Sequence, residues 1–215
     1  MSESPEAFAL KFNALLGEAG VNELNSELLA RFQDYLALLL RWNAQVNLTA
    51  IRDEDGILSR HFVESIACAS ALPVGIKTLL DFGSGAGFPG IPIALCWPEI
   101  AVTLAESQGK KAAFLQEAVR VLGLSAKVHP GRAESLAAQF DCVTMRAVDR
   151  MGLAVRAAAQ LVAPGGWLAL MTTGAELAGL QAAAGATLSW EPAATQSCAG
   201  DRLIAFARRG VSLPA

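Results

Sequence analysis

A glycine-rich segment between two apolar runs limits the folds open to this chain more than any other feature. Residues 79–95, LLDFGSGAGFPGIPIAL, begin as a short buried strand. Glycines then recur at alternate positions: Gly83, Gly85 and Gly87. Glycine adopts positive φ and lets another group come close to the backbone. Pro89 suits the first turn of the helix that follows. Strand, glycine turn and helix start together are typical of a nucleotide-like ligand pocket, although a plain tight turn has the same pattern.

Beyond this turn the chain alternates short apolar runs with amphipathic stretches. Strands are predicted at residues 79–82, 101–106, 126–131, 141–148, 164–171 (after a Pro-Gly-Gly turn) and 201–209, and helices at residues 110–122 and in the Ala-rich stretch up to residue 162. Such alternation predicts an α/β fold with a doubly wound, mostly parallel sheet that helices cover on both faces. Ligands of such sheets bind at the carboxyl ends of the strands, which is where the glycine turn lies.

The first seventy or so residues predict helices instead of strands. Behind Ser26, the predicted cap of a long helix, apolar side chains recur at helical spacing. Asp53 or Asp55 can cap a further helix. We therefore expect a helical extension at residues 1–72, packed on a sheet-containing domain at residues 73–215.

Composition excludes several classes of protein. The 215 residues suffice for one sizeable core, and a net charge of −3 argues against indiscriminate nucleic-acid coating, although a local basic patch remains compatible with it. No apolar stretch approaches the ~20 residues of a membrane span, and the acidic start lacks the basic region of a signal peptide. Cysteines are scattered without metal-ligand spacing: Cys68, Cys96, Cys142 and Cys198. They predict reduced thiols in a cytoplasmic protein and no metal site.

Two kinds of nucleotide-dependent protein begin with such a unit. Gly85, Gly87 and Gly90 satisfy the dinucleotide pattern G-x-G-x-x-G. Glu106, at the end of the next strand, can accept two hydrogen bonds from a ribose diol of a nicotinamide cofactor or of a methyl donor. A solvated charge would look the same at that position. These motifs alone do not distinguish a nicotinamide cofactor from a methyl donor.

Two further features favour the methyl donor. Asp81 precedes the glycines, and residues 161–171, LVAPGGWLALM, join a helix to a strand through Pro-Gly-Gly. In this order the two signals resemble those of class I S-adenosylmethionine-dependent methyltransferases.

Three segments carry a closer resemblance. Residues 41–53 (RWNAQVNLTAIRD), 60–67 (RHFVESIA) and 79–95 together resemble the bacterial ribosomal RNA small-subunit methyltransferase G family, also called glucose-inhibited division protein B. The match runs in consistent order from about residue 28 to residue 208. It implies a Rossmann-like class I fold with a seven-stranded sheet, S-adenosyl-L-methionine as cofactor, and methylation of guanine N7 in 16S ribosomal RNA. The implied target is nucleotide 527 of the 530 loop, and we expect a cytoplasmic monomer.

The resemblance also implies residues of the donor pocket. These are Gly83, Phe88, Ala133, Glu134 and Arg146. One position departs from the family, because Thr172 or Thr173 stands where a lysine is usual after the fifth strand. The sequence does not predict what replaces that RNA contact.

The end of the fourth predicted strand, Met145-Arg146-Ala147, limits the chemistry. Arginine is a poor base, and the Asn/Asp-Pro-Pro-aromatic motif of many amino-group methylases is missing there. Cys142 lies at the wrong end of the strand to be the nucleophile for cytosine C5. A ring nitrogen with an available lone pair, such as guanine N7, fits best. Arg146 is then a catalytic residue with an electrostatic or positioning role, and His61 is assigned to helix packing.

Positive side chains near the strand ends predict how RNA is held. Arg146, Arg150 and Arg202 follow or enter strands, and Lys110 and Lys111 begin a helix, so together they form a plausible phosphate-contacting rim. Guanine N7 lies in a deep, narrow groove of A-form RNA, so the target is expected in a loop or flipped out of the stack. A nicotinamide-dependent oxidoreductase and a non-catalytic S-adenosylmethionine-binding regulatory module stay as alternative functions.

Overall fold

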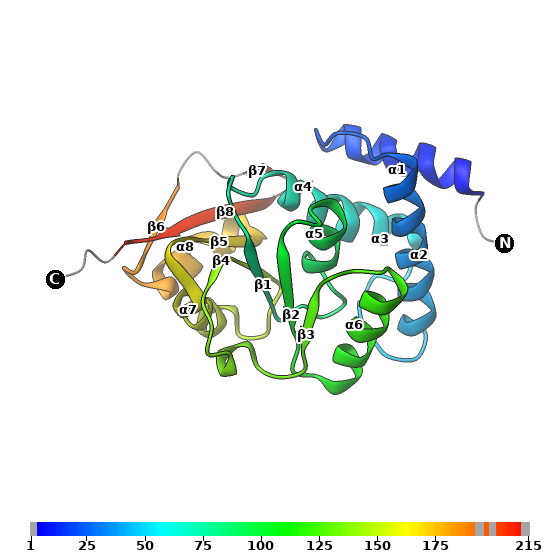
Figure 1. Cartoon of the computed structure of the whole chain (residues 1–215). Coiled ribbons are helices and arrows are strands. Elements are labelled where there is room, and N and C mark those ends of the chain that lie inside the picture. The colour runs from blue at the N-terminus through cyan, green and yellow to red at the C-terminus, as the bar shows by residue number, and fades with distance from the viewer. Residues whose placement is uncertain (1–3, 192–195, 198–200, 212–215) are drawn as a thin grey trace.

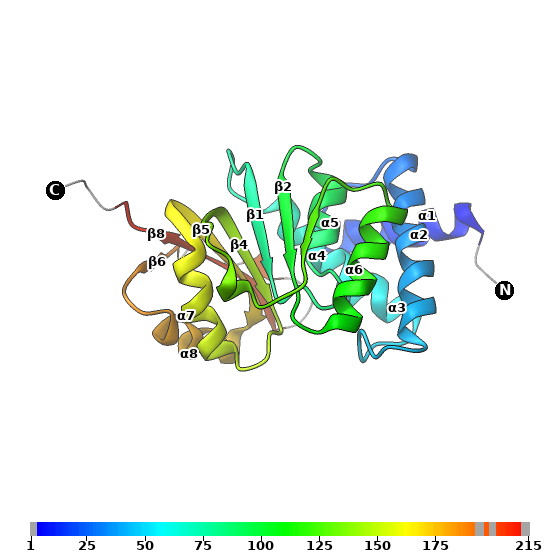
Figure 2. The same ribbon diagram turned by 60° about the horizontal axis from the view of Figure 1, so that its bottom comes forward.

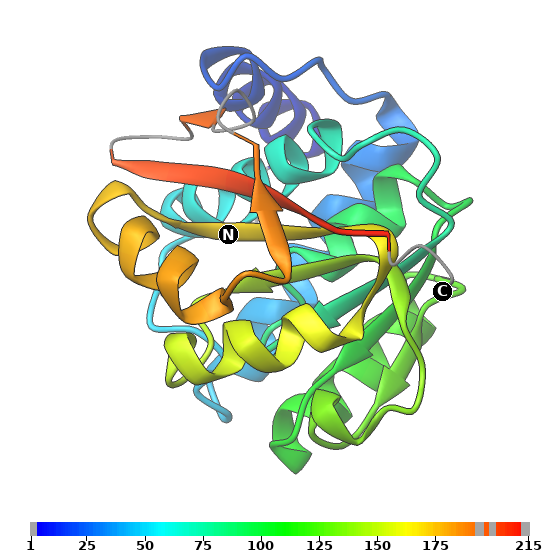
Figure 3. The ribbon, with the colours of Figure 1, turned by 90° about the vertical axis from the view of Figure 1, so that its left-hand side faces the viewer.

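A computed structural model of the chain describes residues 4–191, 196–197 and 201–211, and its centre is one sheet (Figure 1). Seven strands lie side by side in the order β3-β2-β1-β4-β5-β8-β6, and β7 pairs with β8 off this path. The strands are β1 Thr78–Phe82, β2 Ala101–Ala105, β3 Lys127–His129, β4 Phe140–Arg146, β5 Val162–Thr173, β6 Leu188–Trp190, β7 Gln196–Ser197 and β8 Arg202–Arg209. Strands β1 to β5 pair in parallel, whereas β8 runs antiparallel to β5, β6 and β7 (Figure 3). This confirms the predicted mostly parallel α/β sheet.

Helices cover both faces of this sheet (Figure 2). They are α1 Pro5–Glu18, α2 Ser26–Asn43, α3 Glu54–Ile57, the π-helical turn η1 Leu58–Val63, α4 Glu64–Ser70, α5 Gly90–Cys96, α6 Gly109–Val121, the 3₁₀ turn η2 Ala133–Ser135, α7 Met151–Leu161 and α8 Gly174–Ala184. Successive residues of a strand point to opposite faces. Leu79 therefore joins the core under α1 to α6, and Leu80 joins the core under α7 and α8.

The N-terminal helices share a core with the sheet. Phe12, Phe32 and Phe62 are buried there and contact one another ring to ring. Tyr35 of α2 stacks on Phe62, and its hydroxyl donates a hydrogen bond of 2.5 Å to the carbonyl of Ala86 in the glycine turn. These contacts position the extension against the candidate site. The domain division after residue 72 stays a prediction.

Capping side chains differ in part from those expected. Asn25, and not Ser26, caps α2, because its Oδ1 accepts the Leu28 N–H at 2.9 Å. Of the two candidate caps for α3, it is Asp53 that accepts the Gly56 N–H, at 2.6 Å, while Asp55 lies inside the helix.

Two strand ends also differ from those expected. Strand β5 begins at Val162, two residues before the predicted turn at residues 164–166. Its register with β4 passes from Phe140–Val162 directly to Cys142–Trp167, and Gly165 between them has a positive φ of 77°, so the chain bulges out of the strand at the Pro-Gly-Gly segment. Strand β4 stops at Arg146, since Ala147 takes a positive φ of 47°. Helix α8 and strand β6 were not predicted, and Cys198 lies outside the described residues. No helix in the described part of the chain is long and apolar enough to cross a membrane.

Candidate active site

A cavity of about 910 Å³ lies where the carboxyl ends of β1, β2 and β4 meet. Strand order reverses between β1 and β4, and ligands of open α/β sheets bind at such a switch point. The cavity is lined by all the predicted site residues except Arg202: Gly83, Gly85, Phe88, Glu106, Ala133, Glu134, Arg146 and Arg150. Lys111 also lines it.

The glycine turn presents bare backbone to this cavity. Gly83 and Gly85 both have positive φ, 72° and 56°. A Cβ on Gly85 would meet only the Gly83 carbonyl, at 3.9 Å, so a side chain there would project into open space. The Ser84 N–H donates to the Ala105 carbonyl at 2.9 Å, which ties the turn to the end of β2.

Glu106 is buried at the end of β2 and faces the same turn. Its Oε2 accepts the Gly85 N–H at 2.9 Å, and its Oε1 accepts the Gln108 N–H at 2.7 Å. Each carboxylate oxygen has a second lone pair, so the group is oriented and can still accept from a diol.

Asp81 serves the helix beneath the turn and does not line the cavity. Its carboxylate accepts the Gly90 N–H at 3.1 Å and the Thr144 hydroxyl at 3.0 Å. Burial raises the pKa of this carboxyl to about 6. A Cβ on Gly90 would lie 2.7 Å from Asp81 Oδ2, so the third glycine of the motif allows close packing of helix on strand.

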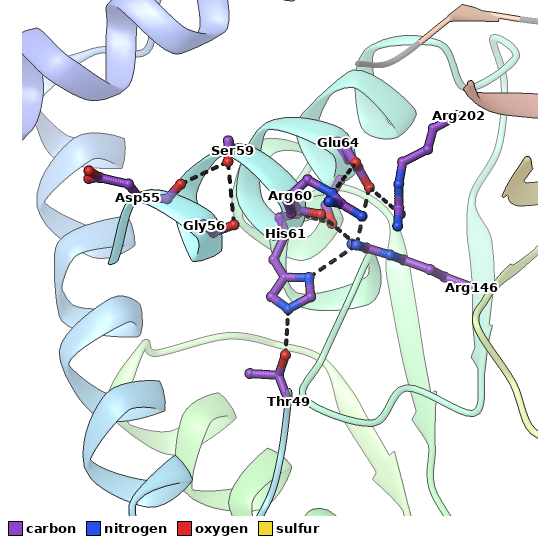
Figure 4. A network of polar contacts seen from close by, with 10 residues as sticks. Thr49, Asp55, Gly56, Ser59, Arg60, His61, Glu64, Arg146 and Arg202 are labelled. Atoms are coloured by element: carbon purple, nitrogen blue, oxygen red, sulfur yellow. Dashed lines mark hydrogen bonds and ion pairs between the residues drawn. The ribbon is translucent and has the colours of Figure 1, made fainter. Parts of the chain in front are cut away.

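Arg146, at the end of β4, belongs to a network of charges around the buried carboxylate of Glu64 (Figure 4). Its Nη2 donates to the Arg60 carbonyl at 2.5 Å and to His61 Nδ1 at 3.0 Å, and it lies 3.1 Å from Glu64 Oε2. Arg202 Nη1 lies 3.2 Å from the same Oε2, and Arg60 Nε lies 3.4 Å from Oε1. One buried carboxylate is therefore the counter-charge for three guanidinium groups.

His61 lines the cavity, so helix packing is an incomplete description of it. Its ring stacks on Phe88 with the centroids 4.7 Å apart and the planes at 18°. Burial, together with the positive charge of Arg146, lowers the His61 pKa to about 3, so the ring is neutral at physiological pH. Its Nε2 lies 2.7 Å from Thr49 Oγ1, and Thr49 also lines the cavity.

Sequence reasoning missed Thr49 and the part that Glu64 plays. Both lie in segments 41–53 and 60–67, which contributed to the family resemblance without any residue being assigned to the site. The π-helical turn η1 carries Arg60 and His61 to Arg146, and such turns are frequent at functional sites.

The predicted basic rim is only partly assembled. Arg150 is exposed at the cavity and precedes α7 with a positive φ of 52°. Arg202 pairs with Glu64 outside the cavity lining, and Arg146 is mostly buried in its own pair with Glu64. The roles of these arginines in RNA binding stay predictions.

The structure also places the threonines after β5 and the cysteine of β4. Thr172 and Thr173, which stand where the family usually has a lysine, both donate to Glu176 Oε2 at 3.1 Å.

Cys142 is buried at the opposite end of β4 from Arg146, and burial raises the pKa of its thiol well above the usual range.

Comparison with known proteins points to one family. A sequence profile described as rRNA small subunit methyltransferase G matches residues 28–203. The Ribosomal RNA small subunit methyltransferase G of Stenotrophomonas maltophilia (strain K279a) is 44% identical over 174 residues, which are 80% of this chain and 81% of that protein. The protein of the same name from Xanthomonas euvesicatoria pv. vesicatoria (strain 85-10) is 46% identical over 140 residues, 64% of this chain and 65% of that protein.

Solved structures agree on the fold. A methyltransferase from Pyrococcus furiosus superposes with a TM-score of 0.62 at 13% identity, over 85% of this chain and 98% of that one. A 16S rRNA N2 G1207 methyltransferase of T. thermophilus, in complex with AdoMet and guanosine, superposes with a TM-score of 0.53 at 17% identity, over 70% of this chain and 40% of that one. These likenesses show the class I methyltransferase fold.

Proposed function

Because this chain belongs to the ribosomal RNA small subunit methyltransferase G family, we propose that it methylates one guanine of 16S ribosomal RNA at N7, with S-adenosyl-L-methionine as the methyl donor. The guanine is the one that the family resemblance implies, nucleotide 527 of the 530 loop. The proposal includes a monomeric enzyme that acts in the cytoplasm on ribosomal RNA or on the small subunit.

The cavity fits such a donor. Glu106 is oriented to accept from the ribose hydroxyls, and Gly85 leaves room for them against the backbone. Ala133 and Glu134, which follow β3, are assigned to the adenine, and Gly83 and Phe88 also to the lining of the donor pocket. The donor supplies a methyl group on a positively charged sulfonium.

The order of strands separates the donor from the target base. Glu106 follows β2, the glycine turn follows β1, and Arg146 ends β4. With the ribose at β2, the proposal puts the target base over the end of β4, the next strand beyond β1, and the strand order supports this. The protein's task is to hold N7, the methyl carbon and the sulfur in line, and alignment of this kind supplies several kcal/mol of the barrier.

The end of β4 is the single observation that carries the choice of N7. It presents the Arg146 guanidinium, which does not take up a proton. N7 needs no base: its lone pair forms the bond to carbon while the carbon–sulfur bond breaks and leaves its electron pair on sulfur. Positive charge passes to the purine, and no proton moves.

Asp149 gives this argument a direct test. It is the exposed carboxylate that follows β4 and lines the cavity, and it would be the base if an amino group were the nucleophile. Asp149→Asn should keep kcat/KM within about threefold and leave its pH profile unchanged, whereas removing a general base costs about 10²–10⁴-fold.

The main experiment measures transfer of labelled methyl groups to small-subunit RNA from a strain that lacks the enzyme. We expect N7-methylguanine at one position. RNA with 7-deazaguanine at that position should bind almost normally and accept no methyl group. Transfer to the 7-deaza RNA would refute N7 as the nucleophile. Binding of NAD without the methyl donor would favour the oxidoreductase, and donor binding without any transfer would favour the regulatory module.

A further inference from the structure

The direction of a hydrogen-bond chain at the cavity is set by Arg146. A guanidinium only donates, so we assign His61 Nδ1, 3.0 Å from Arg146 Nη2, as the acceptor of this bond. A neutral imidazole carries one proton, which therefore sits on Nε2. Desolvation and the charge of Arg146 keep the His61 pKa at about 3, in agreement with a neutral ring.

Because His61 Nε2 carries the proton, the Thr49 hydroxyl accepts from His61 and can only donate to a further group. His61 Nε2–H donates to Thr49 Oγ1 over 2.7 Å, and the Ile51 N–H donates to the same oxygen over 3.2 Å. A hydroxyl oxygen has two lone pairs, and both are used. With the ring proton assigned to Nε2, no acceptor within residues 4–191, 196–197 and 201–211 is left for the hydroxyl hydrogen, and Thr49 borders the cavity.

A donor of fixed direction distinguishes the two purines. Guanine and adenine both offer N7, but guanine has the acceptor O6 beside it, where adenine has the donor N6–H₂. Thr49 approaches from the side of Arg146 and β4, where the proposed function places the base. A hydroxyl that donates would pair with O6, and it would bring two donors face to face if the base were adenine.

The charge of the neighbouring groups suits the reaction. The purine becomes positive on methylation, and a cation against it would oppose that change. His61 and Phe88 form a stacked neutral pair on this wall, and the hydroxyl of Thr49 is neutral too. Arg146, to which His61 is bonded, also lines the cavity, so the neutral part of this wall is confined to these three side chains.

We propose that Thr49 is a specificity-determining residue, whose hydroxyl donates to O6 of the target guanine and so rejects adenine. The proposal rests on the proposed function and adds to it the group that reads position 6 of the base. Arg146 and His61 are positioning residues: Arg146 donates to His61, His61 donates to Thr49, and the Thr49 hydroxyl is thereby left to donate to O6.

The experiment compares wild type, Thr49→Val and Thr49→Ser on RNA with guanine, 6-thioguanine or adenine at the target. Sulfur at position 6 is a weak acceptor, and N7 is retained. Wild type should lose about tenfold in kcat/KM with 6-thioguanine, and Thr49→Val about tenfold with guanine. The kcat/KM of Thr49→Val on 6-thioguanine RNA should be little lower than that of either single change, because both changes remove the same hydrogen bond. Thr49→Val should narrow the preference for guanine over adenine about tenfold, and Thr49→Ser should keep it.

Calorimetry should give the same donor Kd for all three proteins. Additive losses, or an unchanged guanine preference in Thr49→Val, would overturn the proposal. A weaker donor Kd with unchanged preference would assign the hydroxyl to the donor instead. If Thr49→Val does not fold, full activity of wild type on 6-thioguanine RNA is itself a refutation. Methylation by wild type at an atom other than N7 overturns the proposed function and this inference together, whereas N7 product with additive losses overturns this inference alone.

Discussion

Replacing Glu64 by glutamine is the most informative test of the charge network beside the cavity. Glu64→Gln keeps the shape of the side chain and removes its charge. Arg146, Arg202 and Arg60 then lose their shared counter-charge. Since Arg146 contributes its guanidinium to the cavity wall, the change should affect both stability and turnover.

The magnitude follows from the burial of each partner. The Arg146 side chain is 9% exposed, and removing one member of a buried pair typically costs about 3–5 kcal/mol. Arg60 and Arg202 are 43% and 32% exposed, so solvent screens them and each adds less than about 1 kcal/mol. With an m-value of about 3 kcal/mol per M, the urea midpoint should fall by roughly 1–2 M.

Equilibrium urea unfolding, followed by tryptophan fluorescence, measures this directly. Glu117→Gln is the matched control, because Glu117 forms an exposed i,i+3 pair with Arg120, and its midpoint should stay near that of wild type. Arg202→Gln should show a small change. The loss in Glu64→Gln should persist in about 0.5 M salt, since a buried pair is poorly screened. A wild-type midpoint for Glu64→Gln would show that Glu64 does not hold Arg146, and the reasoning would fail.

Three further predictions concern the cofactor pocket, the buried acid and the RNA contact. Gly85→Val places its side chain in the open cavity, at a backbone φ of 56° that strains any other residue by about 1–2 kcal/mol, so calorimetry should detect no donor binding by a folded protein; unchanged affinity would contradict the pocket assignment. The Asp81 pKa is raised from 3.8 to about 6, so its contribution to stability is full below pH 3.8 and is lost as pH rises to about 6. Asp81→Asn should lack this decline, which amounts to about 3 kcal/mol, and urea midpoints at about pH 4 and pH 7 would measure it; a decline as steep as in wild type would refute the assignment. Arg150→Ala should weaken RNA binding and reduce the salt slope by about 1, with an unchanged donor Kd, whereas adding Arg202→Ala should change the slope less, because Arg202 is already paired with Glu64; an unchanged slope in the double variant would remove both residues from the interface.

Local signals account for the parts of the site that the sequence predicted. The glycine turn, Glu106 and Arg146 each lie at the end of a strand whose apolar run is unambiguous, and parallel strands bring such ends together. The confirmed sheet follows from the same alternation of strands and helices. The sequence predicts the start of β5 two residues late, because Val162 already pairs with Phe140 before the irregular Pro-Gly-Gly segment.

Contacts between distant segments could not be predicted. His61 and Arg146 are 85 residues apart, and Glu64 and Arg202 are 138 residues apart. No periodicity relates such pairs, and a histidine on an apolar helix face looks like a packing residue until its neighbours are known. The donor-only character of Thr49 depends on three successive hydrogen bonds, so it becomes visible only once the chain has folded.

The pairing of Glu64 with Arg202 also bears on the order in which the protein becomes active during its synthesis. Helix α4 leaves the ribosome early, whereas β8, which begins at Arg202, is among the last segments to be made. A nascent chain that ends after β5 already contains the glycine turn, Glu106, Thr49 and Arg146. It still lacks one of the three guanidinium groups around Glu64 and the strand that covers the edge of β5. Domains fold from the N-terminus as they emerge, so such a chain can collapse around its early helices before β8 covers the edge of β5. Addition of β8 therefore completes the sheet, because β5, β6 and β7 all pair with this one late strand.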